Sequence, residues 1–191
     1  RRIGSVNTIV RRADGTLFGD NTDAFGFACE ISAAGIDPAG KKALVFGSGG
    51  ASAAVCDVLH QMGANVTVIS RSGSDNYENL DRHADAQLLV NTTPLGMFPN
   101  NGVSPVNLSR FPACQGVLDV VYNPARTALL LQAEALGIPH AGGLVMLVAQ
   151  AARSSERFTG AAISTARQQA VVRQLSVQMQ NIILVGMPGC G

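Results

Sequence analysis

The hydrophobic positions follow two different patterns along the chain. Residues 4–12 are rich in β-branched side chains, the turn sequence 13–15 follows, and residues 16–19 return as a second extended segment. Further on, short runs that are apolar throughout alternate with longer stretches of helical periodicity. The first pattern predicts a hairpin, and the second is typical of parallel strands that helices cover on both faces.

This alternation predicts an α/β fold built on a doubly wound parallel sheet. Glycine and proline positions set the expected ends of the helices, as at Gly35, Gly63 and Gly137. We expect strands at 43–47, 65–70, 87–91 and 116–122, and helices at 23–34, 50–62, 76–84, 125–137, 144–157 and 161–179.

Composition narrows the class of protein. Of the 191 residues, 47% are hydrophobic and 14% charged, and the net charge is +1, so we expect a real core and neither nucleic-acid nor membrane-surface binding. No apolar run approaches the roughly 20 residues of a membrane span. The cysteines form no CxxC pair and no cluster with histidine, which predicts a cytoplasmic protein without a metal site.

The strongest chemical signal is the glycine-rich turn that begins at Gly47, directly after an expected strand and before an expected helix. Glycines in this position let a pyrophosphate approach the backbone, and the helix N-terminus favours its negative charge. The sequence therefore predicts a Rossmann-like dinucleotide site, although Ser52 replaces the third glycine of the usual pattern, and a purely structural turn is the alternative. The expected contacts are Gly47, Ser48, Gly49, Gly50, Ala51 and Ser52.

The end of the next expected strand indicates which cofactor is bound. Sites for NAD carry an acidic residue there, whereas this chain has Arg71 between Ser70 and Ser72. A guanidinium accommodates a 2′-phosphate, so we predict NADP(H); an ordinary exposed arginine is the alternative. Thr92, after the third strand of the sheet, is expected to line the nicotinamide side, unless that segment is only a polar turn.

Polar residues also gather where the hairpin meets the first helix. On physical grounds alone, Asn21 or Thr22 caps the helix and Asp23 stabilises its dipole. A second interpretation gives Asp23 a role in proton transfer, because carbonyl reduction requires a proton as well as a hydride.

Several motifs, in this order and spacing, resemble shikimate dehydrogenase over about residues 1–160. They are GSVNT (4–8), GDNTDAFGF (19–27), GSGGASAA (47–54), SRS (70–72), NTTPLGM (91–97), DVVYNPARTALL (119–130) and GGLVMLVAQAA (142–152).

The resemblance implies an NADP-dependent, reversible reduction of 3-dehydroshikimate to shikimate in the aromatic amino-acid pathway. It implies that Asp23 belongs to a catalytic lysine–aspartate pair and that the substrate contacts also include Asn7, Tyr122 and Gln150. Val120 and Gly143 correspond to positions beside the nicotinamide. The catalytic lysine of the family is expected upstream of Arg1, and Val145 stands where the family often has glycine.

We therefore expect a fragment that binds NADP(H) but is by itself inactive. Its predicted parts are the end of an N-terminal α/β substrate domain (1–22), the NADP-binding domain (23–160), a linker (161–180) and the start of another domain (181–191). The last segment resembles the first strand and unfinished phosphate loop of shikimate kinase, so a fused kinase is the expected partner; an apolar strand with a glycine tail is the alternative. A quinate/shikimate dehydrogenase and a non-catalytic NADP-binding module are the other candidate functions.

Overall fold

The structure, a computed structural model, describes residues 3–180. A short antiparallel hairpin comes first, formed by β1 (Thr8–Arg11) and β2 (Leu17–Asp20), with Thr8 opposite Asp20. The side chain of Asp14 closes its turn by accepting a hydrogen bond from the Thr16 amide at 2.9 Å. The predicted hairpin is confirmed.

The main sheet has five parallel strands in the order β4-β3-β5-β6-β7. This order is that of a doubly wound α/β fold, in which the chain starts near the middle and reverses direction across the sheet. The predicted fold class is confirmed. The strands are β3 (Lys42–Phe46), β4 (Asn65–Ile69), β5 (Leu88–Asn91), β6 (Gly116–Asp119) and β7 (His140–Gly142).

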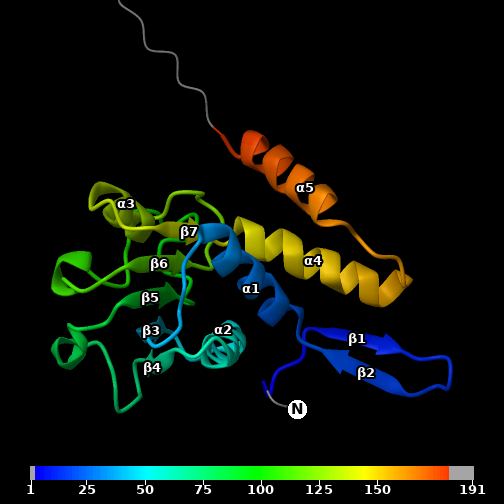
Figure 1. Cartoon of the computed structure of the whole chain (residues 1–191), viewed down its shortest axis with the longest axis horizontal. Helices are drawn as coiled ribbons and strands as arrows, with labels where there is room; N and C mark the ends of the chain where they lie inside the picture. The colour runs from blue at the N-terminus through cyan, green and yellow to red at the C-terminus, as the bar shows by residue number, and fades with distance from the viewer. Residues whose placement is uncertain (1–2, 181–191) are drawn as a thin grey trace, which may run out of the picture.

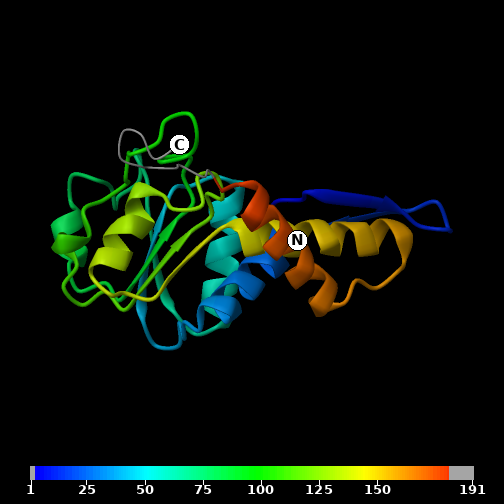
Figure 2. The same cartoon turned by 90° about the horizontal axis from the view of Figure 1, so that it is seen from above.

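Two apolar layers cover the sheet because successive side chains of each buried strand point to opposite faces. Ala43 and Val45 of β3 pack in one layer with Phe27 of the first helix, whereas Leu44 and Phe46 pack in the other. Figure 1 shows the helices on both sides of the sheet, and Figure 2 shows the hairpin extending beyond it beside α4. The helical segments are α1 (Thr22–Ala34), α2 (Gly50–Gln61), α3 (Ala128–Ala135), α4 (Leu144–Thr159), α5 (Thr165–Gln178) and the 3₁₀ turns η1 (Leu80–His83) and η2 (Leu108–Arg110).

Apart from shifted helix ends and the short turn η2, the predicted elements differ from the structure in three places. The helix expected at 76–84 is only the turn η1, because side chains of Asn76 and Asn79 bond to the loop backbone before it. The strand expected at 116–122 ends at Asp119, whose carboxylate accepts a hydrogen bond from the Val121 amide. The three-residue strand β7 was not predicted, since so short an edge strand leaves almost no sequence pattern.

Helices α1 and α4 cross closely and place the hairpin at one end of the sheet. A Cβ atom on Gly26 of α1 would lie 2.6 Å from the carbonyl oxygen of Met146 in α4, so only glycine permits this approach. Arg157 at the far end of α4 donates to Asp20 of β2 at 2.7 Å. The crossing and the ion pair together set the hairpin beside the helices that carry the polar residues described below.

Within residues 3–180, no helix combines the length and the apolar character that a membrane crossing requires.

Candidate functional site

The glycine-rich turn lies at the carboxyl edge of the sheet, between β3 and α2. Gly47 has a φ of 109°, and a Cβ there would lie 2.8 Å from Oγ1 of Thr92. That threonine donates to the carbonyl of Phe46 at 2.6 Å. The turn is therefore packed against the loop after β5, as expected where two neighbouring parallel strands end at one crevice.

The next residues of the turn leave room for a ligand. Added Cβ atoms at Gly49 and Gly50 would meet no atom within 4 Å, and both residues are exposed together with Ser48. Helix α2 begins at Gly50 without a side-chain cap, so its first N–H groups are available to an anion. The residues present thus fit the pyrophosphate of a dinucleotide.

Ala51 and Ser52 are placed differently from the glycines before them. Ala51 is half-buried, and Ser52 is 3% exposed with its hydroxyl 3.9 Å from the sulfur of Cys56. The side chain of Ser52 is therefore buried beside Cys56 on α2 and is not exposed as the glycines before it are. The predicted Ser70, Arg71 and Ser72 follow β4, the strand beside β3, and the last two are exposed.

The predicted Val120 and Gly143 lie together on the other side of the crevice. The amide of Gly143 donates to the carbonyl of Val121 at 3.1 Å, and a Cβ on Gly143 would come within 2.1 Å of the carbonyl oxygen of Val120. No side chain fits at position 143 without moving the backbone after β6. This contact fixes the start of α4 against the loop that carries Val120.

Asp119, at the end of β6, joins three segments at this edge. Its carboxylate is fully buried and accepts from Asn91 at 2.9 Å, from Thr127 at 2.7 Å and from the Val121 amide at 3.1 Å. The Asn91 side-chain oxygen in turn accepts from the hydroxyl of Thr93 at 2.6 Å. Asp119 therefore holds the loops after β5 and β6 and the start of α3 in one arrangement.

A second polar group forms where the hairpin, α1 and α4 meet. The side-chain oxygen of Asn7 accepts from the Thr22 amide at 2.9 Å, while the Thr22 hydroxyl lies 3.3 Å from Oε1 of Gln150 and 2.9 Å from the hydroxyl of Ser154. The Ser154 hydroxyl lies 2.8 Å from that of Thr8. These contacts orient Asn7 and Gln150 from segments that are far apart in the sequence.

Asp23 stands beside this group, in the first turn of α1. Asn21 is the N-cap and accepts from the Asp23 amide at 3.1 Å, which confirms the capping interpretation. Burial raises the pKa of the Asp23 carboxyl above its usual range, and the side chain of Asn7 partly offsets this by hydrogen bonding. A helix cap and a proton-handling role do not compete for the same group, because the cap uses the side chain of Asn21 and the carboxylate of Asp23 takes no part in it.

Tyr122 lies elsewhere. Its side chain is 40% exposed and lines a separate hollow with Ala33, Ala34 and His140. Within residues 3–180, no hydrogen bond joins it to Asn7, Asp23 or Gln150. The structure therefore brings together three of the four predicted substrate contacts.

Glu30, two turns after Asp23 on α1, is a buried acid without a partner. It is 0% exposed, and neither carboxylate oxygen has a hydrogen-bond partner among the described residues. Burial, reinforced by the charge of Asp119, raises the pKa of Glu30 well above its usual range. Burial likewise raises the pKa of Asp119 to about 6, against the effect of its three donors. Burial thus favours the protonated form of Glu30, whereas Asp119 is the acid of the two whose carboxylate is stabilised by hydrogen-bond donors.

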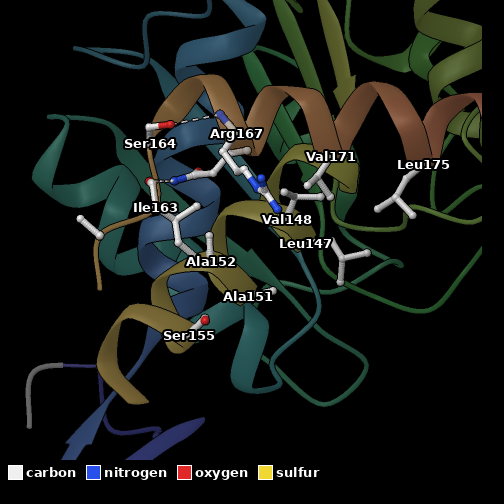
Figure 3. Close-up of a pocket in the computed structure, with 12 residues that line it drawn as sticks. Leu147, Val148, Ala151, Ala152, Ser155, Ile163, Ser164, Arg167, Val171 and Leu175 are labelled. Carbon is white, nitrogen blue, oxygen red and sulfur yellow. Dashed lines mark hydrogen bonds between the residues drawn. The ribbon is translucent and has the colours of Figure 1, made fainter. Parts of the chain in front are cut away.

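A larger hollow between α4 and α5 is not part of this arrangement. Figure 3 shows it lined by apolar side chains of both helices, with Ser164 and Arg167 at one end. None of the predicted site residues lines it. In residues 3–180, no group of three or more His, Cys, Asp or Glu side chains is placed to hold a metal ion.

Several residues of the two polar groups were missed from the sequence. Asn91, Asp119 and Thr127 lie within the motifs that resemble the family, so those motifs were a usable signal, and Thr22 was considered only as a helix cap. Ser154 and Glu30 have no such signal. A polar residue in a helix is expected to be exposed until the packing of that helix is known.

The strand order and the glycine turn define a Rossmann-like α/β domain, open at its carboxyl edge and joined to a hairpin with a polar cluster. No family model matches the chain. It is similar to the shikimate dehydrogenase (NADP(+)) of Methanosarcina acetivorans, with 34% identity over 83% of this chain and 64% of that protein. The corresponding enzyme of Clostridium perfringens is 30% identical, over 92% of this chain and 69% of the relative.

Solved structures agree with these relatives. Shikimate 5-dehydrogenase from Thermus thermophilus, in complex with NADP(H) and shikimate, matches with a TM-score of 0.77 and 35% identity over 91% of this chain and 69% of that one. Quinate dehydrogenase from Corynebacterium glutamicum, in complex with NAD, matches with a TM-score of 0.81 and 27% identity over 91% and 69%. The chain belongs to the shikimate dehydrogenase family. It spans 64% of the length of the Methanosarcina acetivorans relative.

The buried acid pair predicts a pH effect on stability. The native pKa of Glu30 is raised, so between its unfolded value of 4.5 and its native value the folded chain binds more protons than the unfolded chain. The free energy of unfolding should therefore fall as pH rises, by up to about 1.4 kcal/mol per pH unit. In Glu30→Gln this fall should be smaller, so the variant gains stability relative to the wild type with increasing pH.

Urea unfolding at a series of pH values from acid to weakly alkaline measures this difference. Glu78→Gln, at an exposed position, is the matched control and should follow the wild type. Parallel pH dependences for Glu30→Gln and the wild type would show that Glu30 does not hold its proton in the folded chain.

Proposed function

We propose that residues 23–160 bind NADP(H) and form the cofactor half of a dehydrogenase that interconverts 3-dehydroshikimate and shikimate. The observation that carries the proposal is the polar cluster in which Asn7, Asp23 and Gln150 converge from the hairpin, α1 and α4. A polyol needs several fixed polar groups around it, because each unmatched hydroxyl or amide costs binding energy.

The cofactor part rests on the glycine turn and on Arg71. A pyrophosphate requires space and N–H donors. Gly49 and Gly50 leave the space, and the start of α2, which has no side-chain cap, provides the N–H groups. Arg71 is exposed on the neighbouring loop and supplies the charge for a 2′-phosphate. When bound, NADPH supplies the hydride for carbonyl reduction.

The residues of the chain would orient the substrate and move its proton. Asn7 has its side-chain oxygen occupied by Thr22, which leaves its N–H₂ group for Asp23 and for a substrate hydroxyl. Asp23, with its raised pKa, is the group here that can hold or orient a proton near the reacting oxygen. Lys42, at the opposite end of β3, is paired with Asp85 at 2.5 Å and cannot act with Asp23.

The cofactor assignment predicts a preference that a single substitution removes. Calorimetric titration of the purified chain with NADP⁺ and with NAD⁺ should show tighter binding of NADP⁺. In Arg71→Ala that preference should be lost, with a decrease in NADP⁺ affinity of about tenfold or more, because a charge-assisted contact is removed. Arg82→Ala, at an exposed arginine of η1, is the control. Equal affinity for both cofactors in the wild type would contradict the NADP assignment.

The substrate assignment requires the catalytic lysine that the family resemblance places before Arg1. We expect that joining the N-terminal region of the Methanosarcina acetivorans relative to this chain yields NADP⁺-dependent oxidation of shikimate. In that fusion, Asp23→Asn should lower kcat by about 10²–10⁴-fold, as loss of a proton-transfer group does, and leave the NADP⁺ affinity unchanged. A variant with normal kcat would remove Asp23 from the mechanism.

The alternative of broader specificity is supported by the similarity to a quinate dehydrogenase. Quinate offered to the same fusion distinguishes the two: turnover of both polyols supports a quinate/shikimate dehydrogenase. Binding of NADP⁺ without turnover of either would favour a non-catalytic module.

The domain boundaries and the fused kinase are also proposals. The hairpin forms a sheet of its own, consistent with residues 1–22 ending a separate substrate domain, and 161–180 is proposed as a linker. The predicted kinase start at 181–191 lies outside the described residues, so its support is the sequence alone. If the proposal is right, the coding sequence continues directly after Gly191 with Lys and then Ser or Thr. Any other continuation excludes the phosphate loop.

A further inference from the structure

The loop after β4 carries two opposite charges within one tight turn. The Ser70 amide donates to the carbonyl of Asp75 at 3.2 Å, and a Cβ on Gly73 would lie 2.7 Å from the hydroxyl of Ser70. Arg71 and Asp75 therefore belong to a single closed loop. In a doubly wound sheet this loop borders the cofactor ribose, where a cationic side chain favours a 2′-phosphate and an acidic one favours a free 2′-hydroxyl. The charges taken alone leave the choice of cofactor ambiguous.

In the structure, the negative charge of Asp75 has a hydrogen-bond partner, His83. Nε2 of His83 lies 2.8 Å from Oδ1 of Asp75, with the histidine side chain 12% exposed and the aspartate 35% exposed. Nδ1 of His83 is buried without a hydrogen-bond partner among the described residues, so a proton there would find no acceptor. The contact is therefore made by the Nε2–H group donating to the carboxylate.

The position of His83 is fixed by its surroundings. It ends η1, whose first residue Leu80 is 2% exposed in the core. Asn79, just before η1, donates to the carbonyl of Ser74 at 2.7 Å. The segment that carries His83 is therefore anchored in the core and bonded to the loop. A side chain held in this way can restrain the neighbouring Asp75.

Arg71 is in the opposite situation. Its side chain is exposed, and it makes no hydrogen bond or ion pair with any of residues 3–180. Its charge lowers the pKa of Tyr77, although burial has the larger effect and raises it. Tyr77 stacks on Phe46 at the end of β3, with ring centroids 6.2 Å apart. The guanidinium is therefore available to a ligand beside the glycine turn, whereas the carboxylate is engaged.

We propose that His83 is a specificity-determining residue for the cofactor: by binding the Asp75 carboxylate, it keeps that negative charge from the 2′-phosphate position and leaves Arg71 to select NADP(H). This inference rests on the proposed function. It assigns the selection to three residues of which only Arg71 contacts the phosphate. His83 and Asp75 act indirectly: their contact holds the carboxylate away from the phosphate, so the positive charge of Arg71 determines which cofactor binds.

The test is a double-mutant series titrated with NADP⁺ and with NAD⁺. In His83→Ala the Asp75 carboxylate loses its ring N–H donor and, within residues 3–180, keeps only the 3.4 Å contact with the Ser74 hydroxyl. The ratio of NADP⁺ to NAD⁺ affinity should then fall about tenfold, as expected for a negative charge near a bound phosphate. Adding Asp75→Asn to that variant should restore the ratio, and Asp75→Asn alone should keep it at least at the wild-type value. His83→Gln retains an N–H donor and should preserve most of the preference.

The controls separate this proposal from a general loss of structure. His60→Ala, at an exposed histidine of α2, should behave as the wild type. If His83→Ala weakens both cofactors equally, and Asp75→Asn does not rescue it, His83 only stabilises the loop and the proposal is wrong. A wild-type preference for NADP⁺ that Arg71→Ala removes but His83→Ala does not would overturn the inference and leave the proposed function intact. No preference in the wild type would overturn both.

Discussion

The close crossing of α1 and α4 at Gly26 is the constraint on which the polar cluster depends. A side chain at this position would meet the Met146 carbonyl at 2.6 Å and the Cβ of Gln150 at 3.0 Å. If the helices moved apart to admit one, the 3.3 Å contact between Thr22 and Gln150, one turn away, would be broken. The hairpin would be displaced as well, because its ion pair with Arg157 is made by α4. The absence of a Cβ at Gly26 thus permits the close helix crossing that brings together residues from three distant segments.

At the carboxyl edge of the sheet, the buried carboxylate of Asp119 holds neighbouring segments together in a similar way. Leaving a carboxylate in an apolar interior is costly unless hydrogen bonds satisfy it, and Asp119 is satisfied by donors from β5, from the N-cap of α3 and from its own loop. Any movement of one loop leaves the charge partly unsatisfied, so the loops at the carboxyl edge are coupled. Glu30 adds to this constraint. It is buried near Asp119, and the repulsion between two carboxylates there disfavours ionisation of both acids at once.

The sequence was informative wherever the physics is local. Apolar runs such as 43–47 predicted the strands of the sheet, and Gly35 predicted the end of α1, where it adopts φ 64°. The glycine turn and Arg71 could be proposed as cofactor contacts because their chemistry requires particular residues at particular offsets. Contacts made by tertiary packing could not be predicted. One partner of Thr22 is Ser154, 132 residues away, and nothing in either local pattern connects the two. The burial of Glu30 likewise depends on how α1 packs against the sheet.

Helix α1 links the two halves of the proposed site. Asp23 lies in its first turn beside the polar cluster, and Glu30 lies two turns later beneath the cofactor side, next to Asp119. Groups seven residues apart lie on nearly the same face of a helix, so a shift of α1 that carries Asp23 must also move Glu30 against a buried charge. The loop that we propose selects the cofactor follows β4, which β3 and β5 separate from β6 in the order of the sheet. If that proposal is right, substitutions in this loop change which cofactor binds and leave the polar cluster around Asp23 in place. In the proposed site, the residues assigned to cofactor choice and those assigned to proton handling therefore lie on different elements, and α1 connects the latter to the side of the sheet that carries Asp119.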